Sequence, residues 1–319
     1  MGSSILIRGV SVVAMPPAIV VPARRKVLIA DDEPDIHAVT RMSLRDLVHG
    51  GAPVEFVSAA SGQEAVERMR TQPDIGVVLL DVVMEDEHAG LDAIGAIREE
   101  LDNHLVRILL RTGQPGAAPE RETIERYDID GYLPKGEETV NRMFVAVRTA
   151  LRAWDQLVEL DRHRRQLEIV HECAVSLHAF DDVDDMMGTI LDAAVALCPA
   201  PLAILRLETM SSGGEARDVT RHLWTGDDSS AVEAMIDDVA RSLRAGVSAA
   251  GPASGGWVWP IGLDRQLGEG WLYLAAEPDQ LTLTHLSLLV SHARNALYAS
   301  VAQAMLAGRE GPLFTSVSV

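Results

Sequence analysis

Cysteine is nearly absent from this sequence of 319 residues, which contains only Cys173 and Cys198. Two isolated cysteines exclude a disulfide framework and a zinc ribbon, and they favour a reducing compartment. We therefore predict a cytoplasmic protein in which both thiols are small buried groups. Apolar runs are short as well, because none reaches the roughly 18 residues of a membrane-spanning helix. We expect no membrane insertion.

Basic residues are also scarce. Lys and Arg total 28 against 47 Asp and Glu, which gives a formal net charge of −19, and the longest basic runs, 24–26 and 162–165, are short. Such a chain repels nucleic acid unless it carries a local basic patch, so we expect no nucleic-acid partner. The only lysines are Lys26 and Lys135. An ammonium directly after an apolar strand, at Lys135, favours a role that needs a compact cation.

The length of the whole chain suggests two domains of about 150 residues each. Over the first half of the chain, apolar strands alternate with amphipathic helices. Strands are predicted at 26–30, 54–59, 75–80, 106–110 and 130–135. Helices are predicted from the first strand to about His49, from a capping box at Ser61, over 90–101 and 119–127, and from about 137. This alternation is typical of a doubly wound α/β domain with a five-stranded parallel sheet.

The helix that begins near residue 137 is predicted to continue to about residue 178, because residues 140–178 include neither proline nor glycine. Its apolar residues alternate spacings of four and three, as in a coiled coil, with a slip at Asp161 and a resumption at Leu167. We expect the first two turns to pack on their own domain. For 151–177 two interpretations stay open, packing on the chain's own domains or dimerisation.

An α+β domain is predicted beyond this helix. Its helices are expected at 182–197, 231–243 and 284–307, and its strands at 202–207, 257–261 and 270–275. Trp257 and Trp259 alternate on one strand face, and we interpret them as core or dimer-interface residues rather than the lining of a ligand pocket. Segments 1–23 and 308–319 are predicted to be a flexible arm and a disordered tail. A start at Met15 stays open.

Polar residues follow four of the predicted strands: Asp31 and Asp32, Asp81, Thr112, and Lys135. The carboxyl ends of parallel strands meet at one edge of the sheet, where chemistry gathers. Three carboxylates with no basic run nearby indicate a hard-cation site, and Mg²⁺ is its natural occupant. One carboxylate can then attack phosphorus and form an acyl phosphate, while a hydroxyl and an ammonium bind the oxygens of the transferred group.

These residues stand in four longer motifs: Lys26-Val-Leu-Ile-Ala-Asp31-Asp32-Glu33-Pro34, Val77-Val-Leu-Leu-Asp81-Val-Val-Met84, Leu109-Leu-Arg-Thr112-Gly113 and Gly131-Tyr-Leu-Pro-Lys135. Together they resemble the receiver domain of two-component response regulators, over residues 24–150. The resemblance implies a flavodoxin-like fold and a phosphoryl group accepted by Asp81 from a cognate histidine kinase or phosphotransfer protein. It also implies that Asp32 and the backbone carbonyl of Val83 ligate Mg²⁺ with Asp81, while Asp31 helps through water.

The resemblance further implies that Thr112 and Lys135 contact the phosphoryl oxygens. With Thr112 as the other switch residue, Tyr132 would change rotamer on activation, and an ordinary buried tyrosine is the alternative. The chain departs from the family at Glu85, where proline is usual, and at Gly136 after the lysine.

The second domain resembles GAF domains over residues 165–307, mainly in Gly270-Trp-Leu-Tyr-Leu-Ala-Ala-Glu-Pro278. The linker helix 151–178 would join the two domains. The receiver motifs are similar to a subgroup in which a GAF-like domain of unknown function follows and the chain commonly continues into a cyclic-di-GMP phosphodiesterase.

We therefore predict a homodimeric phosphorelay response regulator that signals through the long helix to a GAF-like dimerisation or sensor domain. We predict that it is not an enzyme beyond its own phosphotransfer and dephosphorylation. The sequence has no His-Asp pair followed by Gly-Tyr-Pro, no Gly-Gly-Asp/Glu-Glu-Phe string, no P-loop and no helix-turn-helix. Two alternatives stay open: the regulatory portion of a cyclic-di-GMP phosphodiesterase system without its catalytic domain, or a GAF sensor of a small molecule.

Overall fold

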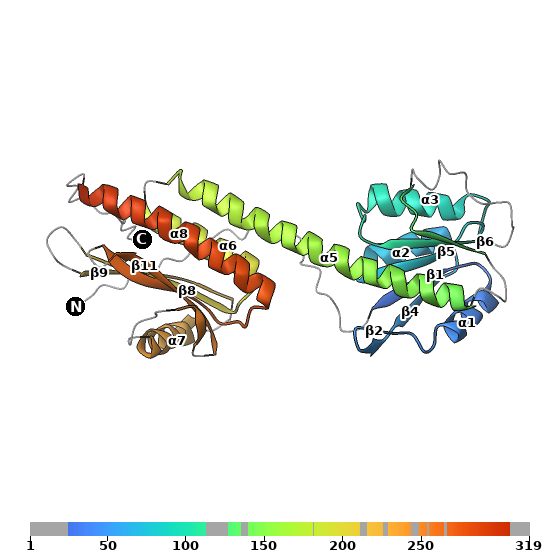
Figure 1. The fold of residues 1–319 in the computed structure, drawn as a ribbon, viewed down its shortest axis with the longest axis horizontal. Coiled ribbons are helices and arrows are strands. Elements are labelled where there is room, and N and C mark those ends of the chain that lie inside the picture. The colour runs from blue at the N-terminus through green and yellow to red at the C-terminus, as the bar shows by residue number, and fades with distance from the viewer. Residues whose placement is uncertain are drawn as a thin grey trace. The chain divides into compact units, whose positions relative to one another are not determined.

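The chain divides into two compact units, one ending at Asp161 and the other beginning at Arg162. The structure is a computed structural model that describes residues 25–112, 127–134, 140–180, 182–210, 216–225, 229–243, 249–253, 255–264 and 267–306. Helix α5 (Val140–Leu177) supplies residues to both units (Figure 1). Among the described residues, no helix is long and apolar enough to cross a bilayer. Outside them lie the predicted arm 1–23, the tail 308–319 and most of the predicted helix 119–127.

The first unit is built on a five-stranded parallel sheet in the order β4-β1-β5-β6-β7 (Figure 1). Its strands are β4 (Glu55–Ala59), β1 (Lys26–Ala30), β5 (Ile75–Asp81), β6 (Arg107–Thr112) and β7 (Gly131–Pro134). Helices α2 (Gly62–Thr71) and α3 (Ala89–Gly95) pack on one face, and the start of α5 packs on the other. All seven residues of β5 are buried, which is typical of a central strand covered on both sides. The predicted flavodoxin-like α/β fold is confirmed.

Two predicted helices of this unit were wrong in part. Helix α1 (Pro34–Ser43) ends before the predicted His49, because a hairpin follows it. The hairpin strands are β2 (Val48–His49) and β3 (Ala52–Pro53). Gly50 and Gly51 between them have φ of 60° and 80°, a conformation that glycine adopts at little cost. The helix predicted over 90–101 is α3 followed by a π-helical turn, Ala96–Glu100.

Helix α5 is anchored to the first unit by Trp154, which is 2% exposed. Its indole covers Gly76 of β5 so closely that a Cβ built there would lie 2.7 Å from the ring. The Arg25 guanidinium lies 5.5 Å from the ring centroid, and its Nε donates to Asp155 Oδ1 at 2.7 Å. His49 Nε2 lies 2.6 Å from the other carboxylate oxygen of Asp155. The middle of α5 therefore packs on its own unit.

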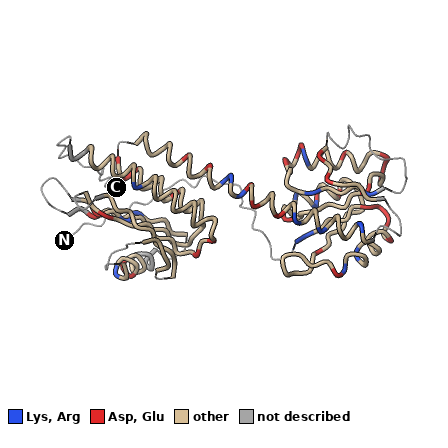
Figure 2. The backbone as a smooth tube through the Cα atoms, viewed as in Figure 1, with Lys and Arg blue, Asp and Glu red and all other residues tan. Residues whose placement is uncertain are grey.

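The second unit contains an antiparallel sheet of five strands in the order β10-β11-β12-β8-β9. Its elements are α6 (Val183–Leu197), β8 (Leu202–Met210), β9 (Ala216–Trp224), α7 (Ser229–Ser242), β10 (Gly251–Ala253), β11 (Gly256–Asp264), β12 (Gly268–Leu274) and α8 (Gln280–Leu306). Helices α6 and α8 pack on one face and α7 packs on the other. Strand β9 was not predicted, because polar residues interrupt its apolar pattern. Basic and acidic positions are interspersed along both units (Figure 2).

The end of α5 belongs to the core of this second unit. Val170 and Leu177 are each 2% exposed and lie in one apolar cluster with residues of α6, α8 and the sheet. Gln166 Nε2 donates to Thr282 Oγ1 of α8 at 3.0 Å. Trp259, 1% exposed, lies in the same cluster, as interpreted from the sequence. Most of the apolar seam of α5 is therefore covered within the chain itself, but Leu167 is 43% exposed.

Candidate functional site

The acidic residues predicted from the strand ends lie together. Asp31 and Asp32 follow β1, and Asp81 ends the neighbouring strand β5. One oxygen of each carboxylate lies within 4.8 Å of the others. Asp31 and Asp81 are 1% and 4% exposed, whereas Asp32 is exposed. This donor set fits Mg²⁺, because it offers only oxygen ligands and keeps one side open to the water molecules that the ion retains.

The backbone after β5 holds Asp81 in place. Val82 N donates to Asp81 Oδ1 at 2.9 Å, and Gly90 N donates to the Val82 carbonyl at 3.2 Å. A Cβ on Gly90 would lie 2.2 Å from the Asp81 carbonyl oxygen, so only glycine allows this approach. The loop between them carries Val83, which is 47% exposed. The first turn of α3 thus closes directly on the strand end that carries Asp81.

Glu85 of this loop binds the N-terminus of α2. Its carboxylate accepts from Gly62 N at 2.9 and 3.0 Å and from Gln63 N at 3.4 Å. Ser61 Oγ accepts from Glu64 N at 3.0 Å, as the predicted capping box requires. Glu64 reaches back to Ala60 N at 2.9 Å rather than to Ser61 N. The residue that replaces the family's usual proline therefore joins the loop after Asp81 to a neighbouring helix.

His37 of α1, which was not predicted from the sequence, supports the backbone beside the acidic site. Its Nε2 lies 2.7 Å from the Asp31 carbonyl oxygen, and its Nδ1 lies 3.0 Å from Ser58 Oγ. Because a carbonyl only accepts, Nε2 carries a hydrogen and donates it to the Asp31 oxygen. Arg41 Nη2 also donates to Ser58 Oγ, at 2.8 Å. The signal in the sequence was the pair of polar residues His37 and Arg41 on the helix that follows Asp31 and Asp32.

Arg111 is a second residue of the site that was not predicted from the sequence. It precedes Thr112 in β6 and pairs in register with Asp81 of β5. Its side chain is 7% exposed, and Nη1 donates to Thr40 Oγ1 of α1 at 2.8 Å. Burial lowers the pKa of Arg111, and the charges of Asp31 and Asp81 oppose that shift. An arginine within an otherwise apolar strand was the signal that could have identified it.

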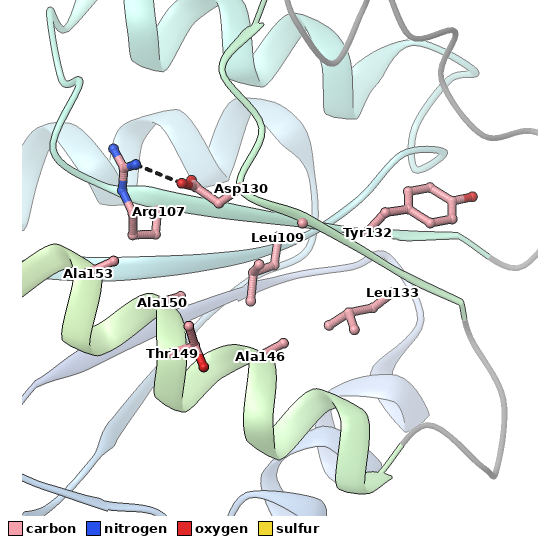
Figure 3. A pocket seen from close by; sticks show the side chains of 10 residues that line it. Arg107, Leu109, Asp130, Tyr132, Leu133, Ala146, Thr149, Ala150 and Ala153 are labelled. Carbon is pink, nitrogen blue, oxygen red and sulfur yellow. Dashed lines mark hydrogen bonds and ion pairs between the residues drawn. The ribbon is translucent and has the colours of Figure 1, made fainter.

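The other predicted site residues are described only in part. Strand β6 ends at Thr112, but its side chain and all of Lys135 lie outside the described residues. Tyr132 of β7 packs against the core cluster of α2 and α3, with its hydroxyl buried and no hydrogen-bond partner among the residues described. A separate pocket of about 310 Å³ lies between β6, β7 and α5, next to the Arg107–Asp130 ion pair of 2.7 Å (Figure 3).

The fold and the acidic site together define a receiver domain. Residues 27–148 match the family model described as response regulator receiver domain. A receiver domain of a putative LuxO repressor protein from Vibrio parahaemolyticus is 17% identical, with a TM-score of 0.37, and covers 43% of this chain and 96% of its own. A response regulator receiver domain from Clostridium thermocellum is 22% identical, with a TM-score of 0.36, and covers 42% and 98%. The family match shows that residues 27–148 of the first unit form a receiver domain of the response-regulator type.

A curated relative is the "3'3'-cGAMP-specific phosphodiesterase 2" of Vibrio cholerae, which is 37% identical over 171 residues. The match covers 54% of this chain, and the chain spans about a third of the relative's length, 33%. The prediction that the chain is not an enzyme is wrong on this finding, because more than half of it resembles part of a phosphodiesterase. The absence of familiar catalytic strings was an insufficient ground for that prediction.

Proposed function

We propose that the chain is a phosphorelay response regulator in which Asp81 accepts a phosphoryl group from a phosphohistidine. The donor would be a histidine kinase or a phosphotransfer protein of the cytoplasm. The observation that carries this proposal is the group of three carboxylate oxygens, from Asp31, Asp32 and Asp81, within 4.8 Å of one another at the ends of β1 and β5. The family match over residues 27–148 supports it.

The reaction needs a positioned carboxylate and compensation of negative charge. A carboxylate oxygen of Asp81 would attack phosphorus as the bond to the donor imidazole nitrogen breaks, and that nitrogen leaves with the bonding electrons. The hydrogen bond from Val82 N orients the carboxylate for this attack. Mg²⁺, bound by Asp32, Asp81 and the Val83 carbonyl and assisted by Asp31 through water, would supply charge that offsets the phosphoryl oxygens.

Two further residues would act on the transferred group. The Thr112 hydroxyl and the Lys135 ammonium would bind its oxygens, as preorganised donors do where charge develops. Tyr132 lies on β7, where it pairs with Leu110 of β6, two residues before Thr112. We propose that Thr112 and Tyr132 change position together and that α5 transmits the change to the GAF-like second unit of a homodimer.

The Asp81→Asn variant tests the phosphoacceptor. Purified protein is incubated with acetyl phosphate and Mg²⁺, and intact-protein mass spectrometry measures the phosphorylated fraction. We expect the wild type to gain one phosphoryl group and Asp81→Asn to gain none. The matched control is Asp86→Asn, because Asp86 is an exposed carboxylate in the same loop. Phosphorylation of Asp81→Asn to the same extent as the wild type would refute the assignment of Asp81 as phosphoacceptor.

We propose, secondly, that this receiver controls the hydrolysis of a cyclic dinucleotide. The 37% identity to a phosphodiesterase specific for 3'3'-cGAMP favours this role. The test replaces Asp81 by Asn in the natural gene and measures cellular cyclic dinucleotides by mass spectrometry, with Asp86→Asn as the control. We expect the level of one cyclic dinucleotide to change in the Asp81 strain alone. Levels equal to those of the wild type would exclude this role.

A further inference from the structure

Three charged residues lie side by side across three neighbouring strands of the receiver sheet. Asp31 follows Ala30, which pairs with Leu80, and the next residue of β5 is Asp81. Asp81 in turn pairs with Arg111 of β6. Residues in register on parallel strands share a face of the sheet, and neighbouring strands are about 4.8 Å apart. The guanidinium of Arg111 therefore shares the sheet face of the two buried carboxylates.

Arg111 differs from the other buried arginines of this unit in how its charge is balanced. Arg107 pairs with Asp130 at 2.7 Å, and Arg98 donates to three backbone carbonyls. Arg111 donates to the neutral hydroxyl of Thr40, and its buried Nε has no partner among the residues described. A buried cation without a contacting carboxylate is costly unless nearby negative charge compensates it. Among the described residues, the charges that act on Arg111 are those of Asp31 and Asp81.

We propose that Arg111 is a positioning residue of the phosphoacceptor site, a fixed counter-charge that stabilises Asp31 and Asp81 without metal and weakens the binding of Mg²⁺. The proposal rests on the proposed function of this site. A cation already present beneath the carboxylates repels an arriving divalent cation. It also offsets the additional negative charge that a phosphoryl group brings to Asp81. The site would consequently need a higher Mg²⁺ concentration for loading than the same carboxylates alone.

Removal of the Arg111 charge should strengthen Mg²⁺ binding, whereas structural damage to the site would weaken it. The Arg111→Met variant keeps a long side chain but removes the charge, so we expect Mg²⁺ to bind about tenfold more tightly, from Coulomb's law in a site partly open to water. Arg111→Lys keeps the charge and should bind Mg²⁺ as the wild type does. The control is Arg70→Met, which removes an exposed arginine from the last turn of α2. The chain runs from there into the start of β5, the end of the strand opposite to Asp81.

Isothermal titration of Mg²⁺ into the full chain measures the four dissociation constants, and thermal unfolding shows which variants are folded. Tighter binding in Arg111→Met alone supports the proposal. Equal or weaker binding in Arg111→Met, or tighter binding in Arg70→Met as well, overturns the proposal on Arg111. Neither result contradicts the Mg²⁺ site itself. If Arg111→Met does not fold, tighter binding in Arg111→Lys overturns the proposal and unchanged binding supports it. A wild type that binds no Mg²⁺ overturns both this proposal and the metal site of the proposed function.

Discussion

The contact between Trp154 and Gly76 gives a sharp test of how α5 is attached to the receiver. Trp154 is 2% exposed, and a Cβ at Gly76 would lie 2.7 and 2.8 Å from two atoms of its ring. Real Cβ atoms do not approach so closely, and the ring is held between β5 and the Arg25 side chain. We expect Gly76→Ala to force the indole outward and to destabilise the first unit.

The magnitude depends on the background. With Trp154 present, Gly76→Ala should cost about 1 to 3 kcal/mol, the usual cost of overpacking. Trp154→Ala alone should cost about 3 to 5 kcal/mol, because it leaves a large cavity. In the Trp154→Ala background, Gly76→Ala should be neutral or stabilising by up to roughly 1 kcal/mol, because alanine replaces a flexible glycine in a strand without a clash. The sign of the Gly76 effect should therefore change.

Urea unfolding followed by far-ultraviolet circular dichroism measures the four proteins of this double-mutant cycle. In the two proteins that carry Trp154→Ala, the remaining tryptophans, Trp224, Trp257, Trp259 and Trp271, all belong to the second unit, so their fluorescence reports that unit separately. Its transition should be the same in these two proteins. An equal cost of Gly76→Ala in both backgrounds would refute the packing argument.

Glu85→Ala should lower the stability of the first unit by about 1 to 2 kcal/mol in thermal unfolding, because two N–H groups of α2 lose a charged acceptor. An equal loss of stability in the exposed control Glu87→Ala would contradict this. Burial, with a smaller contribution from a nearby carboxylate, raises the pKa of Cys173 to about 11, so alkylation by iodoacetamide should be slow at neutral pH. Because the thiol of the unfolded chain ionises near its ordinary pKa of 9.0, the free energy of unfolding should fall as the pH rises from there toward 11. Leu160→Glu with Leu167→Glu should reduce any homodimer in light scattering, since these side chains are 64% and 43% exposed, and an unchanged mass would exclude this face.

The acidic site could be predicted because few geometric facts are needed for it. In a parallel sheet every strand ends at the same edge, so Asp31, Asp32 and Asp81 had to converge once the strands were recognised. His37 and Glu85 could not be found in this way. Their partners, the Asp31 carbonyl and the first N–H groups of α2, lie on other elements, and sequence spacing does not report how a helix is rotated or how a loop returns.

Arg111 illustrates the same limit for charge. The sequence contains an arginine before Thr112, but only the pairing of β5 with β6 and the position of Thr40 on α1 bring its guanidinium beside the acidic residues. Electrostatic interaction depends on distance through space and on burial, neither of which a linear pattern contains.

The long helix divides what the sequence determined from what the tertiary structure decided. The absence of proline and glycine determined one continuous helix, and the spacing of its apolar residues determined which faces avoid water. That spacing is the same whether a second copy or the chain's own sheets cover the seam. Trp154 on Gly76 and Leu177 in the second core show that the chain covers most of its own seam, whereas Leu167 is 43% exposed. Periodicity specifies an apolar face, and only three-dimensional contact specifies what buries it.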